Sequence, residues 1–442
     1  MASFTEYDLT RGSVPRILAL FSWPLVLTNL LQTLFALTDV LIVGRFLGAT
    51  AMSAVTIGGQ GVLFLLTVSM GLAAGGQILL AQLKGAEKTQ EQNRATGTLL
   101  ILALTLGAVA VLAGFFAAPL TLRLLQTPQE ALVDAHTYMR LTSLGLLFAF
   151  VYNAIAGIFR GLGDSKRPLL FSAVAAVLHV GLGLLFVGPW QMGVMGAALA
   201  TVIAQATAAI LAAWNLISKR QKVTRPTAIE FRNILKIGLP FGLQMGLLQL
   251  SNLFIIRLVN PHGIAASAAL GAGSRVTNLL TLPMLAIGNG AATVVGQNLG
   301  AKQPKRAQAA IRWALVYTLL FVAATMTLTL AFPTRLVGIF TDDPMVIEIG
   351  VQHLRILAWC YIGHALHSSF NAAILGAGRT HYSLIAAGAE ALLGRVALTW
   401  MLSIPWALTG IFAAQAIAPY LAATLSLIWW HKVDWRAAGL QK

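Results

Sequence analysis

An acidic residue, Asp39, lies within a stretch of sequence that is apolar for long enough to cross a membrane. The stretch runs from Trp23 to Arg45, and about 20 mainly apolar residues make one membrane-spanning helix. On a helix, Asn29, Gln32 and Asp39 share one face. A carboxylate at the centre of a membrane helix costs about 2.5–3.5 kcal/mol, so such an acid is a candidate functional residue. The alternative interpretation is a structural acid near the helix end that pairs with Arg45.

The composition is that of an integral membrane protein. Hydrophobic residues make up 57% of the 442 and charged residues only 10%, whereas soluble domains average about 25% charged residues. The formal net charge of +16 does not require a nucleic-acid partner, because excess Lys and Arg marks the cytoplasmic loops of membrane proteins. The single cysteine, Cys360, excludes an intrachain disulfide and a cysteine-rich metal site. We therefore expect a lipid bilayer around the chain, and no nucleic acid as a partner.

The hydropathy pattern predicts twelve membrane-spanning helices joined by short loops. The expected spans are 15–43, 52–80, 95–118, 137–159, 168–188, 193–217, 233–258, 265–297, 310–332, 348–375, 382–403 and 408–431. Basic residues gather in the loops that follow the even-numbered spans. The positive-inside rule places these loops, and both termini, in the cytoplasm.

The second half of the chain repeats the first. Pro24 and Pro240 begin matching stretches that lie 216 residues apart, and Pro189 and Pro405 have the same separation. Each copy holds six spans, an even number, so both copies have the same orientation in the membrane. Such parallel repeats are related by an axis along the membrane normal, and alternating access arises when the two halves rock. Asp39 has no acidic counterpart in the second copy, because the equivalent residue is Ile255.

The predicted fold is therefore all-α, with twelve transmembrane helices in two pseudo-symmetric six-helix lobes. We predict an N-lobe over residues 1–217, a cytoplasmic connector over 218–232 and a C-lobe over 233–442.

Three motifs make the sequence resemble the multidrug and toxic compound extrusion (MATE) transporters. They are the first-span segment Leu37–Ala49, the loop Arg160–Pro168, and the related ends of spans two and eight at Ala81–Ala86 and Gly296–Ala301. The resemblance covers nearly the whole chain. It implies two six-helix lobes in the cytoplasmic (inner) membrane of a bacterial-type cell, and a monomer. It also implies export of organic cations or amphipathic compounds, by exchange against protons or sodium ions with alternating access.

The resemblance also assigns candidate ion-coupling residues. Asp39 matches the first-span aspartate that the DinF-type branch of the family uses for ion coupling. In the fifth span, where that branch often carries Asn and Asp, this chain has His179 and Gly183. The threonine of the sixth span corresponds to Thr201. The chain is therefore similar to the DinF-type branch in part, with an imidazole in place of the second carboxylate.

The acidic residues of the NorM-type branch are missing. The corresponding positions in spans seven and ten read Leu248 and His364. We therefore expect the proton as the coupling ion, with sodium as the alternative, and no cofactor or metal.

His179 suggests a proton relay. Span five places it near mid-membrane, where its imidazole could reach Asp39 directly or through a shared water. A carboxyl and an imidazole in contact titrate as a coupled pair, and an imidazole changes charge between about pH 5 and 8. We hypothesise that Asp39, His179 and Thr201 together form the ion-coupling site.

Other polar residues inside the spans are candidates for a substrate cavity, with hydrogen bonding between helices as the alternative. They are Asn29, Gln32, Asn153, Gln244, Gln249, Asn252, Asn278, His364 and His367. Glu390 is a possible second ionisable site, with a structural ion pair to an in-span arginine as the preferred interpretation. The two histidines lie one helical turn apart, but no third metal ligand is evident.

Two other functions compete with drug export. A flippase for a lipid-linked oligosaccharide or another amphipathic lipid would explain the in-span arginines, but the number of spans and the first-span motif oppose it. A membrane-embedded enzyme would need a convergent catalytic set. The sequence has no HExxH motif, no paired intramembrane aspartates and no Ser/His/Asp arrangement identifiable by spacing. We therefore predict a transporter rather than an enzyme.

Overall fold

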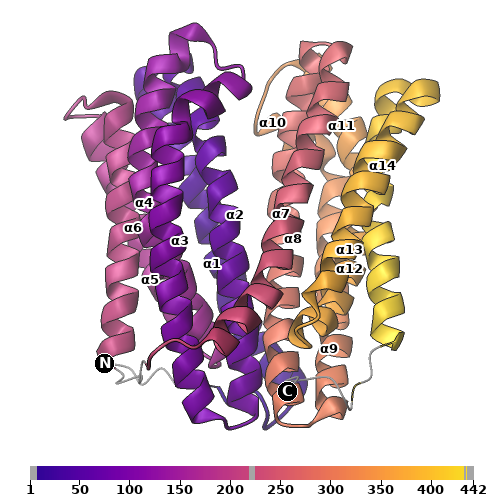
Figure 1. Cartoon of the computed structure of the whole chain (residues 1–442). Coiled ribbons are helices and arrows are strands. Elements are labelled where there is room, and N and C mark those ends of the chain that lie inside the picture. Colours follow the sequence, from indigo (N-terminus) through magenta and orange to yellow (C-terminus); the bar gives the residue numbers. More distant parts are fainter. Residues whose placement is uncertain (1–6, 219–223, 433–434, 436–442) are drawn as a thin grey trace. The chain divides into compact units, whose positions relative to one another are not determined.

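The protein is all-helical over the residues that its structure, a computed structural model, describes, namely 7–218, 224–432 and 435 (Figure 1). Lys219, Arg220 and Lys222 of the basic connector, and both ends of the chain, lie outside these residues. The elements in order are α1 (Val14–Leu47), α2 (Ala49–Gly85), α3 (Thr89–Leu124), α4 (Gln129–Gly161), α5 (Lys166–Val187), α6 (Gly193–Ser218), α7 (Ala228–Val259), η1 (Asn260–His262), α8 (Ile264–Gly300), α9 (Pro304–Ala331), α10 (Pro333–Gly338), α11 (Pro344–Leu357), α12 (Cys360–Gly376), α13 (Thr380–Gly388), η2 (Ala389–Leu398) and α14 (Thr399–Lys432).

The lengths of these helices confirm a multi-pass membrane protein. Within the described chain, ten helical segments are long and apolar enough to cross a membrane, and the bent pair α11 and α12 makes an eleventh. One of the ten, Thr380–Lys432, comprises α13, η2 and α14 and has 53 residues. It is broken at Ala407, whose φ of 46° and ψ of −127° are not helical. Since about 20 residues suffice for one span, this segment has the length of two, which agrees with twelve spans.

Two compact units make up the described chain, and their limits differ from the limits of the sequence repeat. Unit 1 comprises Tyr7 and Leu27–Gly242, and unit 2 comprises Asp8–Val26 and Leu243–Lys442, both within the described residues. The first part of α1 therefore belongs to unit 2, and the first part of α7 belongs to unit 1. In each of these two helices the change of unit follows an internal proline, Pro24 or Pro240, by two residues. A proline inside a helix removes one backbone hydrogen bond and kinks the helix.

Small residues let the helices of unit 1 approach one another closely. On α4, a Cβ at Gly157 would lie 2.7 Å from the backbone oxygen of Ala73. One turn further, a Cβ at Gly161 would lie 2.6 Å from the backbone oxygen of Gln77 on α2. This spacing of small residues four apart is typical of close helix crossings in membranes, where association depends on van der Waals contact rather than on the hydrophobic effect.

The α8–α12 pair of unit 2 repeats this packing. A Cβ at Gly376 would lie 2.7 Å from the backbone oxygen of Ala292, and one at Gly288 would lie 2.9 Å from that of Ser368. Gly376 is the repeat counterpart of Gly161, so the duplicated sequence preserves the tightest helix crossing in both units.

The beginning of the chain is anchored in unit 2. The side-chain amide of Asn298 donates to the backbone oxygen of Leu9 at 3.0 Å, and Arg306 donates to that of Gly12 at 2.8 Å. The Tyr317 hydroxyl donates to the backbone oxygen of Pro15 at 3.0 Å. The residues just before and within the first turns of α1 are therefore held by helices α8 and α9.

We predict that Gly157→Ala destabilises the protein by about 1–3 kcal/mol, as overpacking does elsewhere. The added methyl group would meet a backbone oxygen of α2, which can move only if the two helices separate. Thermal unfolding of the purified protein measures the effect. Gly181→Ala on α5 is the control, because a Cβ there has no neighbour within 4 Å; equal stability of the two variants would contradict the packing argument.

Candidate functional site

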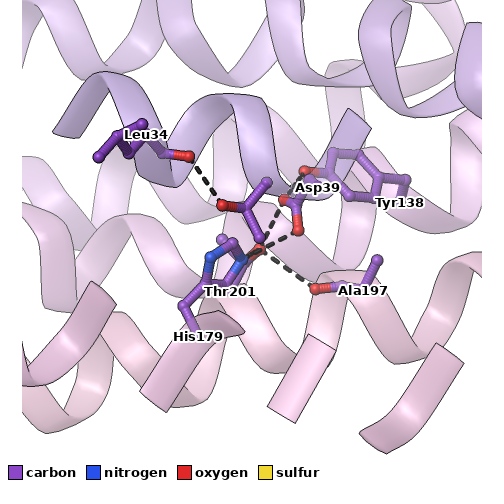
Figure 2. A network of polar contacts seen from close by, with 7 residues as sticks. Leu34, Asp39, Tyr138, His179, Ala197 and Thr201 are labelled. Carbon is purple, nitrogen blue, oxygen red and sulfur yellow. Dashed lines mark hydrogen bonds and ion pairs between the residues drawn. The ribbon is translucent and has the colours of Figure 1, made fainter. Parts of the chain in front are cut away.

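Four helices of unit 1 bring polar side chains together around Asp39. The carboxylate projects from α1, and it meets Tyr138 of α4, His179 of α5 and Thr201 of α6 (Figure 2). These residues are buried, with exposed fractions of 5% for Asp39 and 0% for His179. The arrangement places one carboxylate inside a helix bundle, with each of its contacts supplied by a different helix.

The distances are those of hydrogen bonds. The Tyr138 hydroxyl donates to Oδ2 of Asp39 at 2.6 Å, and the Thr201 hydroxyl lies 2.9 Å from the same oxygen. Nε2 of His179 lies 2.9 Å from Oδ1 of Asp39 and 3.2 Å from the Thr201 hydroxyl. The Thr201 hydroxyl also lies 3.2 Å from the backbone oxygen of Ala197. Both carboxylate oxygens therefore have partners.

This pattern of donors fits an ionised Asp39. An ionised carboxylate only accepts hydrogen bonds, and three groups here can donate to it: a phenol, an imidazole N–H and an alcohol. Hydrogen bonds to a charged group contribute about 1.5–3 kcal/mol each. Together they offset the cost of burying the charge. A protonated Asp39 would instead have to donate, so at least one of the three neighbours would have to change its role.

His179 is held so that only one of its ring nitrogens meets Asp39. Its ring stacks on Phe35, with 3.8 Å between the ring centres and 12° between the planes. Phe35 precedes Asp39 by about one turn of α1, so one face of this helix orients the imidazole. Nδ1 of His179 is buried and has no hydrogen-bond partner among the described residues. The neutral ring with its proton on Nε2 therefore satisfies Asp39 and leaves no buried N–H unpaired.

Apolar packing surrounds this network. Ile42 and Val43 of α1 are buried in a cluster with Val187 of α5 and Val194 of α6. A Cβ at Gly183 would lie 3.0 Å from Cδ1 of Ile42. The place where a second carboxylate would stand is thus filled by an α1 side chain, which explains physically why a glycine occurs there.

The structure brings together the three residues that the sequence selected for ion coupling, and it adds a fourth. Tyr138 was missed because it lies at the expected start of a span, where a tyrosine is normally interpreted as an interfacial anchor. Nothing in the spacing along the chain relates it to Asp39, 99 residues earlier.

The other candidates of unit 1 lie outside this network. Asn29 is half-buried and Gln32 is exposed on α1. Asn153 of α4 donates to the Ser69 hydroxyl of α2 at 3.1 Å, so this amide joins two helices.

The candidates of unit 2 fall into one connected group and several separate residues. Asn252 joins Gln249 and Arg395, and Arg395 pairs with Glu390 at 3.0 Å. Gln244, by contrast, accepts a hydrogen bond from Ser383 at 2.7 Å.

Three candidates of unit 2 are outside that group's hydrogen bonds. Nδ1 of His367 lies 3.0 Å from the Ser426 hydroxyl, His364 is half-buried on α12, and Asn278 is exposed on α8. Among the described residues, no three His, Cys, Asp or Glu side chains are grouped so that they could hold a metal ion.

Comparison with known proteins connects this geometry with a family. The MatE family profile matches residues 24–185 and again 240–401, two stretches separated by the 216 residues of the sequence repeat. The probable multidrug resistance protein YpnP of Bacillus subtilis (strain 168) is 32% identical over 92% of this chain and 90% of its own length. YoeA, a probable multidrug resistance protein of the same organism, is 28% identical over 80% of this chain and 79% of its own.

A solved structure has the same fold. It shows the outward-facing conformation of a multidrug resistance MATE family transporter of the MOP superfamily, and it covers 98% of both chains with a TM-score of 0.92 at 22% identity. The duplicated family match, the similarity to multidrug resistance proteins along nearly the whole chain and the shared fold lead to one conclusion: this chain is a multi-pass membrane transporter that belongs to the MatE (multidrug and toxic compound extrusion) family.

Proposed function

We propose that the protein is a secondary active exporter of cationic or amphipathic small molecules, driven by exchange against a cation, the proton, and not an enzyme. The single observation that supports this proposal is the buried Asp39 carboxylate, which is shared by hydrogen bonds among α4, α5 and α6. A carboxylate in this position can take up and release a proton, and each of its contacts depends on its charge.

Protonation of Asp39 changes the hydrogen bonds of the whole network. The new O–H needs an acceptor, and a neutral His179 can accept only if its own proton moves to Nδ1. That nitrogen is buried without a partner among the described residues, and an unsatisfied buried N–H costs about 1–3 kcal/mol. The alternative is transfer of the proton to the ring, which gives an imidazolium. Either outcome favours a different arrangement of α1 against α5.

A change in α1 would then couple the proton to the substrate. In the deprotonated state Asp39 acts as the counter-ion of a bound organic cation. When a proton arrives from the outside, that charge disappears and the second part of α1 rearranges, so the cation leaves. Release of the proton to the cytoplasm restores the first state. In this cycle both termini lie in the cytoplasm of a bacterial-type cell, and the monomer in the inner membrane alternates between outward and inward access.

We predict that Asp39→Asn reduces gradient-driven efflux of ethidium to the level of membranes without the protein. The amide keeps the shape of the side chain but cannot exchange a proton. The measurement uses everted vesicles, in which the proton gradient and the sodium gradient are collapsed separately.

Asp342→Asn is the matched control, because this carboxyl is exposed in the segment before α11. It should transport as the parent does. Parental efflux by Asp39→Asn would refute the proposed coupling, and efflux that stops only when the sodium gradient is removed would refute the proton as the coupling ion.

We predict that His179→Gln alters the pH profile of efflux. Histidine is the residue type of the network whose ordinary titration falls between about pH 5 and 8, whereas glutamine keeps an N–H donor without a titratable ring. Efflux rates are measured from pH 5.5 to 8.5. His262→Gln, in the exposed η1 turn, serves as the control. If His179→Gln retains both the parental rate and the parental profile, the relay hypothesis is wrong.

We predict that Tyr138→Phe destabilises the protein by about 1.5–3 kcal/mol, because it removes a 2.6 Å hydrogen bond to a charged group. In the Asp39→Asn background the same substitution should cost less, since the acceptor is no longer charged. A double-mutant cycle on thermal unfolding gives the coupling between the two residues. Additive effects would mean that the hydroxyl does not depend on the charge of Asp39.

A further inference from the structure

Unit 2 carries a charged pair at the position that His179 occupies in unit 1. Arg395 follows His179 by 216 residues, the separation of the two family matches. The counterpart of Asp39, Ile255, is buried in an apolar cluster. The repeat therefore places a permanent cation in unit 2 where unit 1 has an imidazole, and an apolar side chain where unit 1 has its acid.

The acid that pairs with this arginine comes from the same element. Nε and Nη2 of Arg395 donate to Oε1 of Glu390 at 3.2 and 3.0 Å. The two residues are five positions apart, which in an α-helix would put them on different faces. They meet because η2 is a π-helix, in which hydrogen bonds also join residues five apart. Helical segments of this kind occur frequently at functional sites.

The pair exposes its cation and hides its anion. The Glu390 side chain is 3% exposed, whereas that of Arg395 is 18% exposed. Glu390 also interacts electrostatically with His364 and His367 of α12. A ligand that enters this region therefore meets the guanidinium before the carboxylate, and an organic cation would be repelled by it.

Arg395 has donors left for a ligand. A guanidinium has five N–H groups, and three of them donate to Glu390 and Asn252 among the described residues. Asn252 accepts at 2.8 Å and is itself exposed on α7. In-span charges face the interior of a helix bundle or a water-filled cavity rather than lipid. The open edge of the guanidinium and the Asn252 amide can thus bind an oxyanion from one side.

We propose that Arg395 and Asn252 bind an anionic oxygen group, a carboxylate or phosphate, of an amphipathic substrate, and that Glu390 is the internal counter-ion with which this group competes. The inference deepens the proposed export function, on which it rests, by extending the substrates from cations to zwitterions and anions. Arg395 lies 12 residues before the break at Ala407, about 18 Å of helix. A phosphate at the membrane surface would therefore not reach it, and the group belongs to the substrate itself.

The test uses two dyes that differ at one group. Rhodamine B carries a carboxylate, and its ethyl ester does not. Binding of each dye to the purified full-length protein is measured by fluorescence anisotropy at equilibrium, without any gradient. Failure of proton-driven efflux therefore does not affect this result.

We expect Arg395→Gln to weaken rhodamine B binding about tenfold and to leave the ester unchanged, because it removes a charged hydrogen-bond donor. Glu390→Gln should strengthen rhodamine B binding severalfold, because the competing charge is gone while its shape remains. The double variant Glu390→Gln with Arg395→Gln leaves no buried charge unpaired, so it keeps the test valid if Arg395→Gln does not fold. It should bind both dyes equally well. Arg312→Gln, an exposed arginine of α9, is the control.

Three results would overturn the proposal. The first is equal weakening of both dyes by Arg395→Gln or by the double variant, as a purely structural ion pair would give. The second is Glu390→Gln that weakens rhodamine B binding or leaves it unchanged. The third is competition by phosphatidylglycerol in lipid discs that depends on Arg395, which would assign the site to a lipid headgroup.

Discussion

A charged carboxylate inside a membrane helix bundle must find its hydrogen bonds within the protein. In unit 1 that requirement falls on Asp39, and Tyr138, His179 and Thr201 meet it from three helices. The close approach of α2 and α4 through glycines, and the packing of Ile42 against Gly183, hold these helices at the necessary distances. The same requirement makes the arrangement sensitive to a single proton, because the donors suit the ionised carboxylate and not the acid.

The fold followed from sequence patterns that physical constraints impose strongly. Apolar runs of membrane length and a duplicated proline register predicted an all-α, twelve-span protein with two related halves, and the helices and the duplicated family match confirm this architecture. The contacts of the site followed less completely. His179 and Thr201 could be related to Asp39 through family resemblance, but the rotation of α4 that turns Tyr138 inward depends on packing against α2, which hydropathy does not encode. The π-helical turn of η2 was equally hidden, since Glu390 and Arg395 would face apart in an ordinary helix.

Duplication has preserved the packing of the two units while their charges have diverged. The glycine-mediated crossing of α2 with α4 recurs between α8 and α12. In contrast, the Asp39 position has become the buried Ile255, and the His179 position has become Arg395. Backbone contact at the crossings restricts residue size, so these positions tolerate little change. Polar positions inside the bundle require only that each charge has a partner, and acid and base can therefore be exchanged between helices.

The exchange of half-helices between the two units has a consequence for biosynthesis. Residues 8–26 leave the ribosome first, but their partners Asn298, Arg306 and Tyr317 are made almost 300 residues later. Unit 1, in turn, is incomplete until the chain has been synthesised as far as Gly242. Neither half of the gene thus encodes a self-sufficient folding unit, although the sequence looks like a tandem duplication. The first segment to enter the membrane must remain without its final partners while most of the protein is translated, which makes the start of α1 the part most dependent on insertion factors and chaperones.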